Sequence, residues 1–207
     1  GKGLDSDIAE AMFWYEKAAE QNHIESQYRI GRGYMDGRGV AKQDKASFRW
    51  LRMAADQNHK QAASYLGDLF RTGRGTEIDI AKAVSYYRRA ANGGVMEAQY
   101  QLAKIISGPG ASDADITEAI SLYDQAAQQG DGRSQLILGI YFDEGSVIPE
   151  NKQRAESYLL MAAAQMIEDA QFRLAQLYDS GAIKDKSASD ALPFYRSAAE
   201  QGHVGAH

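Results

Sequence analysis

Small and apolar residues recur along this chain of 207 residues with a period of 36. In each copy a small residue, a large apolar residue and an alanine follow one another at i, i+4 and i+7, as at Ala11, Tyr15 and Ala18. This spacing is one face of an α-helix. A strict period of this size indicates a repeat protein built from one supersecondary unit. The alanine pairs that mark the period are Ala18-Ala19, Ala54-Ala55, Ala90-Ala91, Ala126-Ala127, Ala162-Ala163 and Ala198-Ala199.

A second apolar set lies upstream in each copy and predicts a second helix. Its large residues occupy one repeat position, and a glycine or an alanine follows each of them. A glycine inside a helix costs up to about 1 kcal/mol. We therefore interpret Gly31, Gly67 and Gly139 as positions where the backbone of a neighbouring helix approaches closely. The large residues are Ile30, Leu66, Leu102, Leu138 and Leu174.

Loop residues predict where the helices begin and end. The segments at 37–40 and 73–76 read Gly-Arg-Gly-Val and Gly-Arg-Gly-Thr, and glycine reaches the positive φ angles that end a helix. Residues 1–4 read Gly-Lys-Gly-Leu, and we expect another copy of this loop there. A column of good N-capping residues follows, with Gln43 as its exception, and Asp115 with Glu118 resembles a capping box. The predicted N-caps are Asp7, Asp79, Asp115, Asn151 and Ser187.

The pattern predicts an all-α fold without a β-sheet. We expect a right-handed α-α superhelix (solenoid) of about five to six 36-residue helix-turn-helix repeats, forming a single domain over residues 1–207. We also expect this domain to be truncated at both ends, because the sequence starts within a loop and stops one turn into a helix. A lone helix at about 7–21 should precede the helix pairs. These pairs are expected at about 24–57, 60–92, 96–129, 132–165 and 168–201.

The repeat resembles the Sel1-like repeat, a relative of the tetratricopeptide repeat. Its best matches are IGRGYMDGRGV at residues 30–40 and ALPFYRSAAEQGH at residues 191–203. The resemblance covers essentially the whole chain and implies an α-solenoid that acts as a protein-protein adaptor. Such adaptors occur in bacterial envelopes, among secreted virulence factors and in endoplasmic-reticulum quality control. A bacterial periplasmic or secreted setting is favoured, but the sequence leaves the compartment open.

Composition removes several classes of function. No run approaches the roughly 20 apolar residues that span a membrane, so we expect no direct membrane insertion. The absence of cysteine excludes disulfides, thiol catalysis and thiolate metal sites. Residues 1–107 carry a net charge of +3 and residues 108–207 carry −8. A sequence pI near 5.4 argues against nucleic acid as a partner, although a basic protein could be attracted to the C-terminal half.

The sequence offers no convincing catalytic or metal-binding set. His23, His59 and His203 share one repeat column, where the family pattern has histidine for structural reasons. His203 and His207 have the i, i+4 spacing of a metal pair, but no third ligand is evident. Adjacent carboxylates such as Asp143 and Glu144 point in different directions on a helix. We therefore expect no enzyme activity, no metal and no cofactor.

The likeness to tetratricopeptide repeats implies that the first helix of each repeat lines the concave face. Position 28 and its equivalents lie on that face, where the column is aromatic or apolar in most copies. Two interpretations stay open for it: packing between successive first helices, or anchors for a bound protein or peptide. For the second interpretation, the candidate partner-binding residues are Tyr28, Arg32, Arg71, Tyr100, Lys104, Leu136, Ile140, Phe172 and Gln176.

We accordingly predict a non-catalytic scaffold or adaptor that binds another protein or a peptide. The alternative is a structural spacer or self-assembly element of a larger envelope or signalling protein, with possible end-to-end association of the fragment. A hydrolase is the third hypothesis, for which the sequence shows no reactive constellation outside the repeat pattern.

Overall fold

The computed structural model describes residues 2–206, and the side chains of residues 7–205. Within that range the chain forms eleven α-helices and one final 3-10 turn, and it contains no strand. The helices are α1 (Lys2–Glu20), α2 (Ile24–Asp36), α3 (Asp44–Asp56), α4 (Lys60–Thr72), α5 (Ile80–Asn92), α6 (Met96–Ile106), α7 (Asp113–Gln128), α8 (Gly132–Glu144), α9 (Lys152–Ala163), α10 (Glu168–Asp179) and α11 (Ala188–Glu200), followed by η1 (Val204–Ala206).

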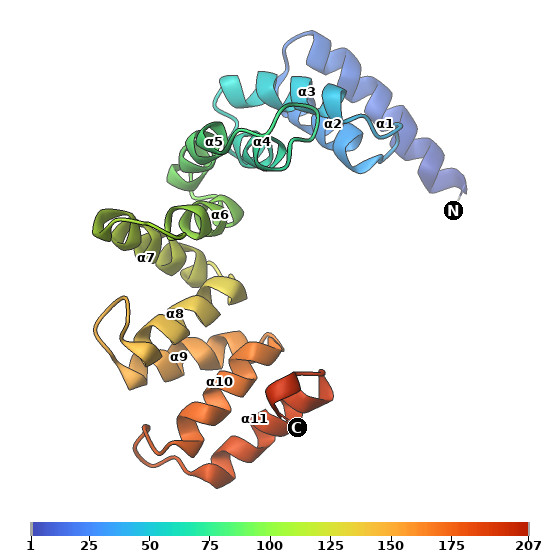
Figure 1. Cartoon of the computed structure of the whole chain (residues 1–207). Helices are drawn as coiled ribbons and strands as arrows, with labels where there is room; N and C mark the ends of the chain where they lie inside the picture. The colour runs from blue at the N-terminus through green and yellow to red at the C-terminus, as the bar shows by residue number, and fades with distance from the viewer. Residues whose placement is uncertain (1, 207) are drawn as a thin grey trace. The chain divides into compact units, whose positions relative to one another are not determined.

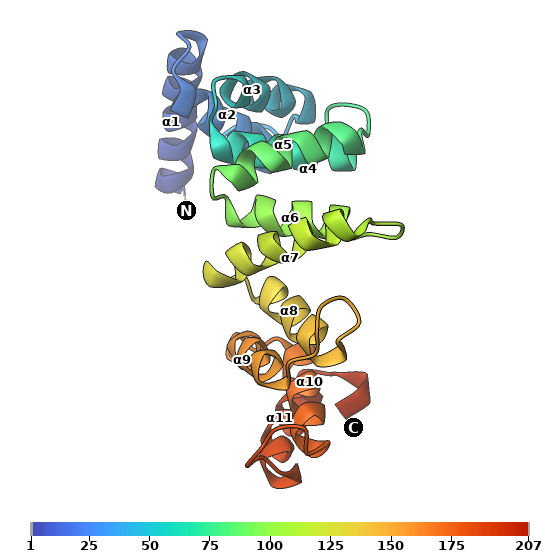
Figure 2. The same ribbon diagram turned by 90° about the vertical axis from the view of Figure 1, so that its left-hand side faces the viewer.

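The chain divides into two compact units, residues 1–105 and residues 106–207, and each unit is described by itself. In the first unit, α2 packs against α3 and α4 packs against α5 (Figure 1). In the second unit, α8 packs against α9 and α10 packs against α11 (Figure 2). These four helix hairpins lie where the 36-residue pattern predicts them.

Two predicted helix starts are wrong. Helix α1 already runs from Lys2, so Asp7 lies inside it and residues 2–4 are helical rather than a loop; Gly1 lies outside the described residues. Glycine permits a turn but does not impose one, since its cost in a helix is only about 1 kcal/mol. Helix α7 begins at Asp113, because Ser112 and Asp115 form a reciprocal capping box one turn earlier than expected.

Other predicted caps are confirmed. Asp79 Oδ1 accepts a hydrogen bond from the Lys82 backbone N–H at 2.9 Å, and Asn151 Oδ1 accepts from Arg154 at the same distance. Ser187 is the N-cap of α11. Gln43 caps α3 without a side-chain hydrogen bond, as expected for the exception in the column.

The glycine column marks close helix contacts, but chiefly with side chains of the paired helix rather than, as predicted, with its backbone. A Cβ on Gly67 would lie 2.7 Å from the ring of Tyr87, and one on Gly139 would lie 2.7 Å from Leu159 Cγ. Both distances are shorter than van der Waals contact allows. The obstacle is chiefly a large side chain of the paired helix, so a small residue on the first helix makes room for a large residue on the second.

The alanine pairs lie in the last turn of the second helix of each repeat. The backbone N–H of His59 donates to the Ala54 carbonyl at 3.0 Å, and Asn58 between them has a φ of 66°. This geometry is that of a Schellman-type helix end. The residues at the equivalent positive-φ position are Asn22, Asn58, Gly94, Gly130, Met166 and Gly202.

A ladder of glutamines ties successive repeats together within each unit. Buried Gln135 donates from Nε2 to the Ala127 carbonyl at 3.0 Å, and its Oε1 accepts from Gln165 at 2.9 Å. The same pattern links Gln171 to Gln201 at 2.6 Å and Gln27 to Gln57 at 2.8 Å. The sequence analysis missed these pairs, although each pair recurs at a spacing of 30 residues.

Candidate functional site

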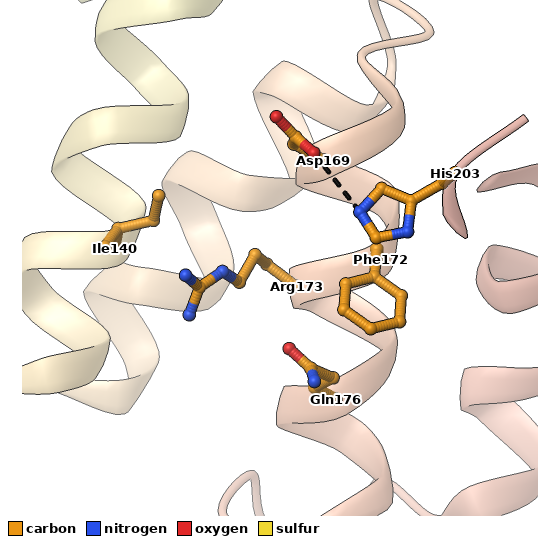
Figure 3. A pocket seen from close by; sticks show the side chains of 6 residues that line it. All are labelled: Ile140, Asp169, Phe172, Arg173, Gln176 and His203. Atoms are coloured by element: carbon orange, nitrogen blue, oxygen red, sulfur yellow. Dashed lines mark ion pairs between the residues drawn. The ribbon is translucent and has the colours of Figure 1, made fainter. Parts of the chain in front are cut away.

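A surface pocket of about 370 Å³ lies on the second unit, beside α10. Its walls combine apolar, charged and amide side chains from three places in the chain (Figure 3). One of the lining side chains comes from α8, four come from α10, and one belongs to a residue that follows α11. The lining residues are Ile140, Asp169, Phe172, Arg173, Gln176 and His203.

The ring of Phe172 is held in place by α11 and by the residue that follows this helix, His203. His203 stacks on it with ring centroids 4.1 Å apart and an interplanar angle of 26°, and Tyr195 meets it edge-on at 5.8 Å. His203 Nε2 lies 3.2 Å from Asp169 Oδ1, and Nδ1 accepts a hydrogen bond from the Gly205 N–H at 3.2 Å. These contacts give the half-buried phenylalanine a defined orientation at the pocket.

The first unit builds the same arrangement from its own residues. His59 stacks on Tyr28 with centroids 4.4 Å apart, and His59 Nε2 lies 3.2 Å from Glu25 Oε2. His59 Nδ1 caps helix α4 by accepting from the Ala62 N–H at 3.2 Å. The aromatic residue, the acidic residue and the histidine are each 144 residues, or four repeats, before their counterparts in the second unit.

A pocket of about 410 Å³ opens beside this arrangement in the first unit. Four helix positions line both pockets: Glu25 and Asp169, Tyr28 and Phe172, Arg29 and Arg173, Arg32 and Gln176. The remaining walls differ, because α1 closes the first pocket and Ile140 of α8 closes the second. A pocket therefore lies beside the same four positions of the first helix in both units.

Ion pairs at the rims are exposed and replaceable. Arg29 Nε donates to Glu25 Oε1 at 2.7 Å, and Arg173 lies 3.3 Å from Glu144. Partial burial acts to raise the pKa of Glu25, but hydrogen bonds from His59 and Arg29 together outweigh it and lower this pKa. Exposed pairs of this kind contribute about 0–1 kcal/mol, so a ligand could exchange for one partner at little cost.

Five of the predicted partner-binding residues line these pockets. Tyr28 and Arg32 lie in the first unit's pocket, where Arg32 Nη2 donates to Asp36 at 3.0 Å and its guanidinium lies over the Tyr65 ring. The other three line the second unit's pocket. They are Ile140, Phe172 and Gln176.

The other four predicted residues lie outside both pockets. Arg71 is occupied by the Tyr87 hydroxyl at 3.2 Å and by Asp68 at 3.4 Å. Leu136 packs against the core of the second unit. Tyr100 is half-buried and Lys104 is exposed, both on α6.

Packing accounts for part of the aromatic column. Tyr28 and Phe172 stack on the histidine at the end of their own repeat, and Tyr28 also lies 6.1 Å from the ring of Tyr65 on the next first helix, α4. The interpretation as partner anchors stays a prediction. Sequence analysis missed the roles of Glu25, Asp169 and the stacked histidines. The signal was present, since an acidic residue stands three positions before the aromatic residue, and a histidine 31 positions after it, in both of these repeats.

The structural role expected for the histidine column is confirmed. His23 and His59 are the N-caps of α2 and α4. No group of three His, Asp or Glu side chains among the described residues is arranged to hold a metal ion. His207, the possible partner of His203, lies outside the described residues. No helix within residues 2–206 combines the length and the apolar character needed to cross a membrane.

Comparison with known families finds the Sel1 repeat six times along the chain. The matched segments are residues 1–23, 24–59, 60–95, 97–131, 132–165 and 168–203. No protein with a curated description matches this chain in sequence.

Solved structures provide close matches to the fold. A protective antigen of uropathogenic Escherichia coli with an SLR fold superimposes with a TM-score of 0.89 at 30% identity, over 96% of this chain and 42% of that protein. A Sel1 repeat protein from Oxalobacter formigenes gives a TM-score of 0.81 at 30% identity, over 97% of this chain and 82% of that one. This chain therefore spans less than half the length of the first of these proteins. The prediction of an all-α repeat solenoid is confirmed.

Proposed function

Because this chain belongs to the Sel1 repeat family, whose members generally act as non-catalytic protein-interaction scaffolds, we propose that it binds a partner protein or peptide on the face lined by the first helix of each repeat. In solenoids of stacked helix pairs this is the concave face, which offers an extended binding surface. The chain itself would contribute binding and positioning rather than chemistry.

One observation carries the proposal: the two pockets occupy equivalent positions on first helices four repeats apart. Each pocket has an oriented, half-buried aromatic ring, an arginine and a carboxylate. Aromatic anchors surrounded by polar and charged groups are typical of the energetically important part of protein interfaces. An arrangement used only for packing would not require a hollow beside the ring in both units.

Ile140→Lys tests the proposal on the second unit's pocket. Ile140 is half-buried and lies opposite Phe172, so the substitution places a charge in the pocket without disturbing the histidine stack. Affinity capture with the whole chain should lose its partner, while the circular dichroism spectrum stays unchanged.

Leu160→Lys is the matched control, because Leu160 is an exposed leucine on α9, the second helix of its repeat. It should retain the partner. Capture that survives Ile140→Lys but fails with Leu160→Lys would assign binding to the opposite face and reject the proposal.

Self-assembly is the second candidate, and one observation favours it. Trp14 on α1 is 62% exposed, whereas Trp50, its equivalent one repeat later, is only 4% exposed. Phe13 beside it is 51% exposed. A large exposed apolar patch marks a contact surface, so a second copy could cover it. Sedimentation velocity over a hundredfold concentration range should then reveal association that Trp14→Lys abolishes, and a concentration-independent monomer would exclude this role.

A further inference from the structure

Two carboxylates, one at the pocket of the second unit and one beside it on α10, have no lysine or arginine paired with them among the described side chains. Asp169 at its rim is 63% exposed and contacts His203. Asp179 is exposed and lies on the same face of α10 as Phe172 and Gln176, since residues three and seven apart share a face of a helix. Among the described side chains Asp179 has no ion pair. The cation of the pocket, Arg173, is already paired with Glu144 at 3.3 Å.

The equivalent positions of the first unit have a different charge. Gln176 corresponds to Arg32, and Asp179 corresponds to Met35. The difference extends to the units as a whole, because the residues up to 105 carry a net charge of +3 and those from 106 onward carry −8. The two equivalent pockets therefore lie on units of opposite net charge, positive for the first unit and negative for the second.

We propose that the second unit's pocket binds a basic protein segment. An apolar side chain of that segment packs against Ile140 and Phe172, and a neighbouring lysine or arginine pairs with Asp169 or Asp179. This inference rests on the proposed function and adds the chemistry of the partner. Charge complementarity of this kind speeds association and rejects acidic competitors, and the aromatic ring adds a favourable surface for a cation.

A pair of synthetic peptides of equal length tests the charge preference. One reads Lys-Leu-Lys-Lys-Leu-Lys, and in the other every lysine is replaced by glutamate. Titrated into the full, nitrogen-15-labelled chain, the basic peptide should shift the backbone amide resonances of Phe172 and Gln176, and the acidic peptide should not. The affinity of the basic peptide should fall about fivefold or more from low to physiological salt, because exposed charges are screened. Equal shifts with both peptides would overturn the proposal.

A double variant locates the charges that matter. Asp169→Asn with Asp179→Asn should weaken binding of the basic peptide about five- to tenfold. Asparagine at position 169 keeps an oxygen that can face His203 Nε2. Glu150→Gln with Asp185→Asn is the control, since both residues are exposed and the same net charge is removed. The control should stay within about twofold of wild type. Equal weakening in both doubles would mean that net charge, and not this pocket, attracts the peptide.

The remaining outcomes separate this inference from the proposed function. Resonances that stay unshifted with the basic peptide, while partner capture still depends on Ile140, would reject a basic partner and leave the scaffold function standing. Capture that is independent of Ile140 would reject the scaffold function of this face. Shifts of the same resonances that grow with protein concentration alone would identify a second copy as the occupant, against the proposal.

Discussion

The imidazole of His59 stacks on the ring of Tyr28 while its Nδ1 caps the first turn of α4. One side chain therefore ends one repeat, starts the next first helix and orients the aromatic residue of the preceding first helix. The equivalent contact between His203 and Phe172 in the second unit indicates that this stack is a recurring feature of the repeat rather than an isolated contact.

Replacing His59 should separate these roles. His59→Ala removes both the cap and the ring stack and should lower the free energy of unfolding by about 2 kcal/mol, since a cap contributes about 1 and an aromatic contact about 0.5–1.5 kcal/mol. His59→Asn retains a good capping side chain and should recover about half of that loss. Urea unfolding of the three proteins measures both values, and an asparagine variant no better than alanine would contradict the assigned cap.

Met166 occupies a backbone position that suits it poorly. Its φ is 60°, where the equivalent residues are asparagine or glycine. At Asn22 the side chain also accepts hydrogen bonds from Gln27 at 3.0 Å and Gln57 at 2.9 Å. The Met166 sulfur accepts only a long contact from Gln171 Nε2, at 3.7 Å. Met166→Asn should therefore raise the free energy of unfolding by about 1 kcal/mol, through relief of left-handed strain and through replacement of the weak sulfur acceptor by an amide oxygen.

The reverse exchange, Asn58→Met, serves as the control and should destabilise the chain by a similar amount. Thermal and urea unfolding of both variants provide the measurement. A neutral Met166→Asn together with a destabilising Asn58→Met would contradict the prediction. It would mean that the positive φ of Met166 costs no measurable free energy of unfolding.

The glutamine ladder should be more sensitive at its buried member than at its exposed member. Gln135 is 4% exposed, and removing its amide takes one hydrogen-bond partner from the Ala127 carbonyl and one from the Gln165 side chain. The Ala127 carbonyl keeps the Gly130 N–H at 3.0 Å, and Gln165 keeps the Gly130 carbonyl at 3.1 Å. Gln135→Ala should cost about 2–3 kcal/mol, because buried polar groups that lose a bond carry a desolvation cost. Gln165→Ala, at the exposed member, should cost less than about 1.5 kcal/mol. Equal losses in urea unfolding would argue against the ladder.

The Asp44–Arg74 contact should make the first unit sensitive to acid. Arg74 donates to Asp44 Oδ1 at 2.7 Å, and this hydrogen bond lowers the pKa of the Asp44 carboxyl below its ordinary value. A lowered folded-state pKa contributes stability above the unfolded value of about 3.9, and that contribution is lost as the pH falls through the folded-state pKa.

Asp44→Asn should therefore reduce the free energy of unfolding at pH 7 by less than about 1 kcal/mol, since the pair is more than one-third exposed. The difference from wild type should shrink as the pH falls through the lowered folded-state pKa of Asp44, because the carboxyl is then protonated in both states. Unfolding curves at pH 7, 4 and 2 measure it, and a difference as large at pH 2 as at pH 7 would assign the effect to something other than the charge.

Much of the fold was readable from local patterns. Helix faces, the glycine contacts at Gly67 and Gly139, and the caps at Asp79 and Asn151 depend on neighbours that repeat at fixed spacing. The starts of α1 and α7 were not readable in this way, because Asp7 and Asp115 matched the capping column while the helices began earlier. An N-cap is decided by competition between candidate residues, as Ser112 demonstrates by capping α7 together with Asp115.

The sequence by itself determined the repeat, its helices and their buried faces, because these follow from periodicity and side-chain size. Only the tertiary structure decided which columns meet. In the tertiary structure Ile140 lies across the pocket from Phe172. Arg71 donates hydrogen bonds to Asp68 and Tyr87. His203 stacks on Phe172, and His59 stacks on Tyr28. Contacts between residues about 30 positions apart depend on how successive helix pairs stack, and no local spacing along the chain encodes that geometry.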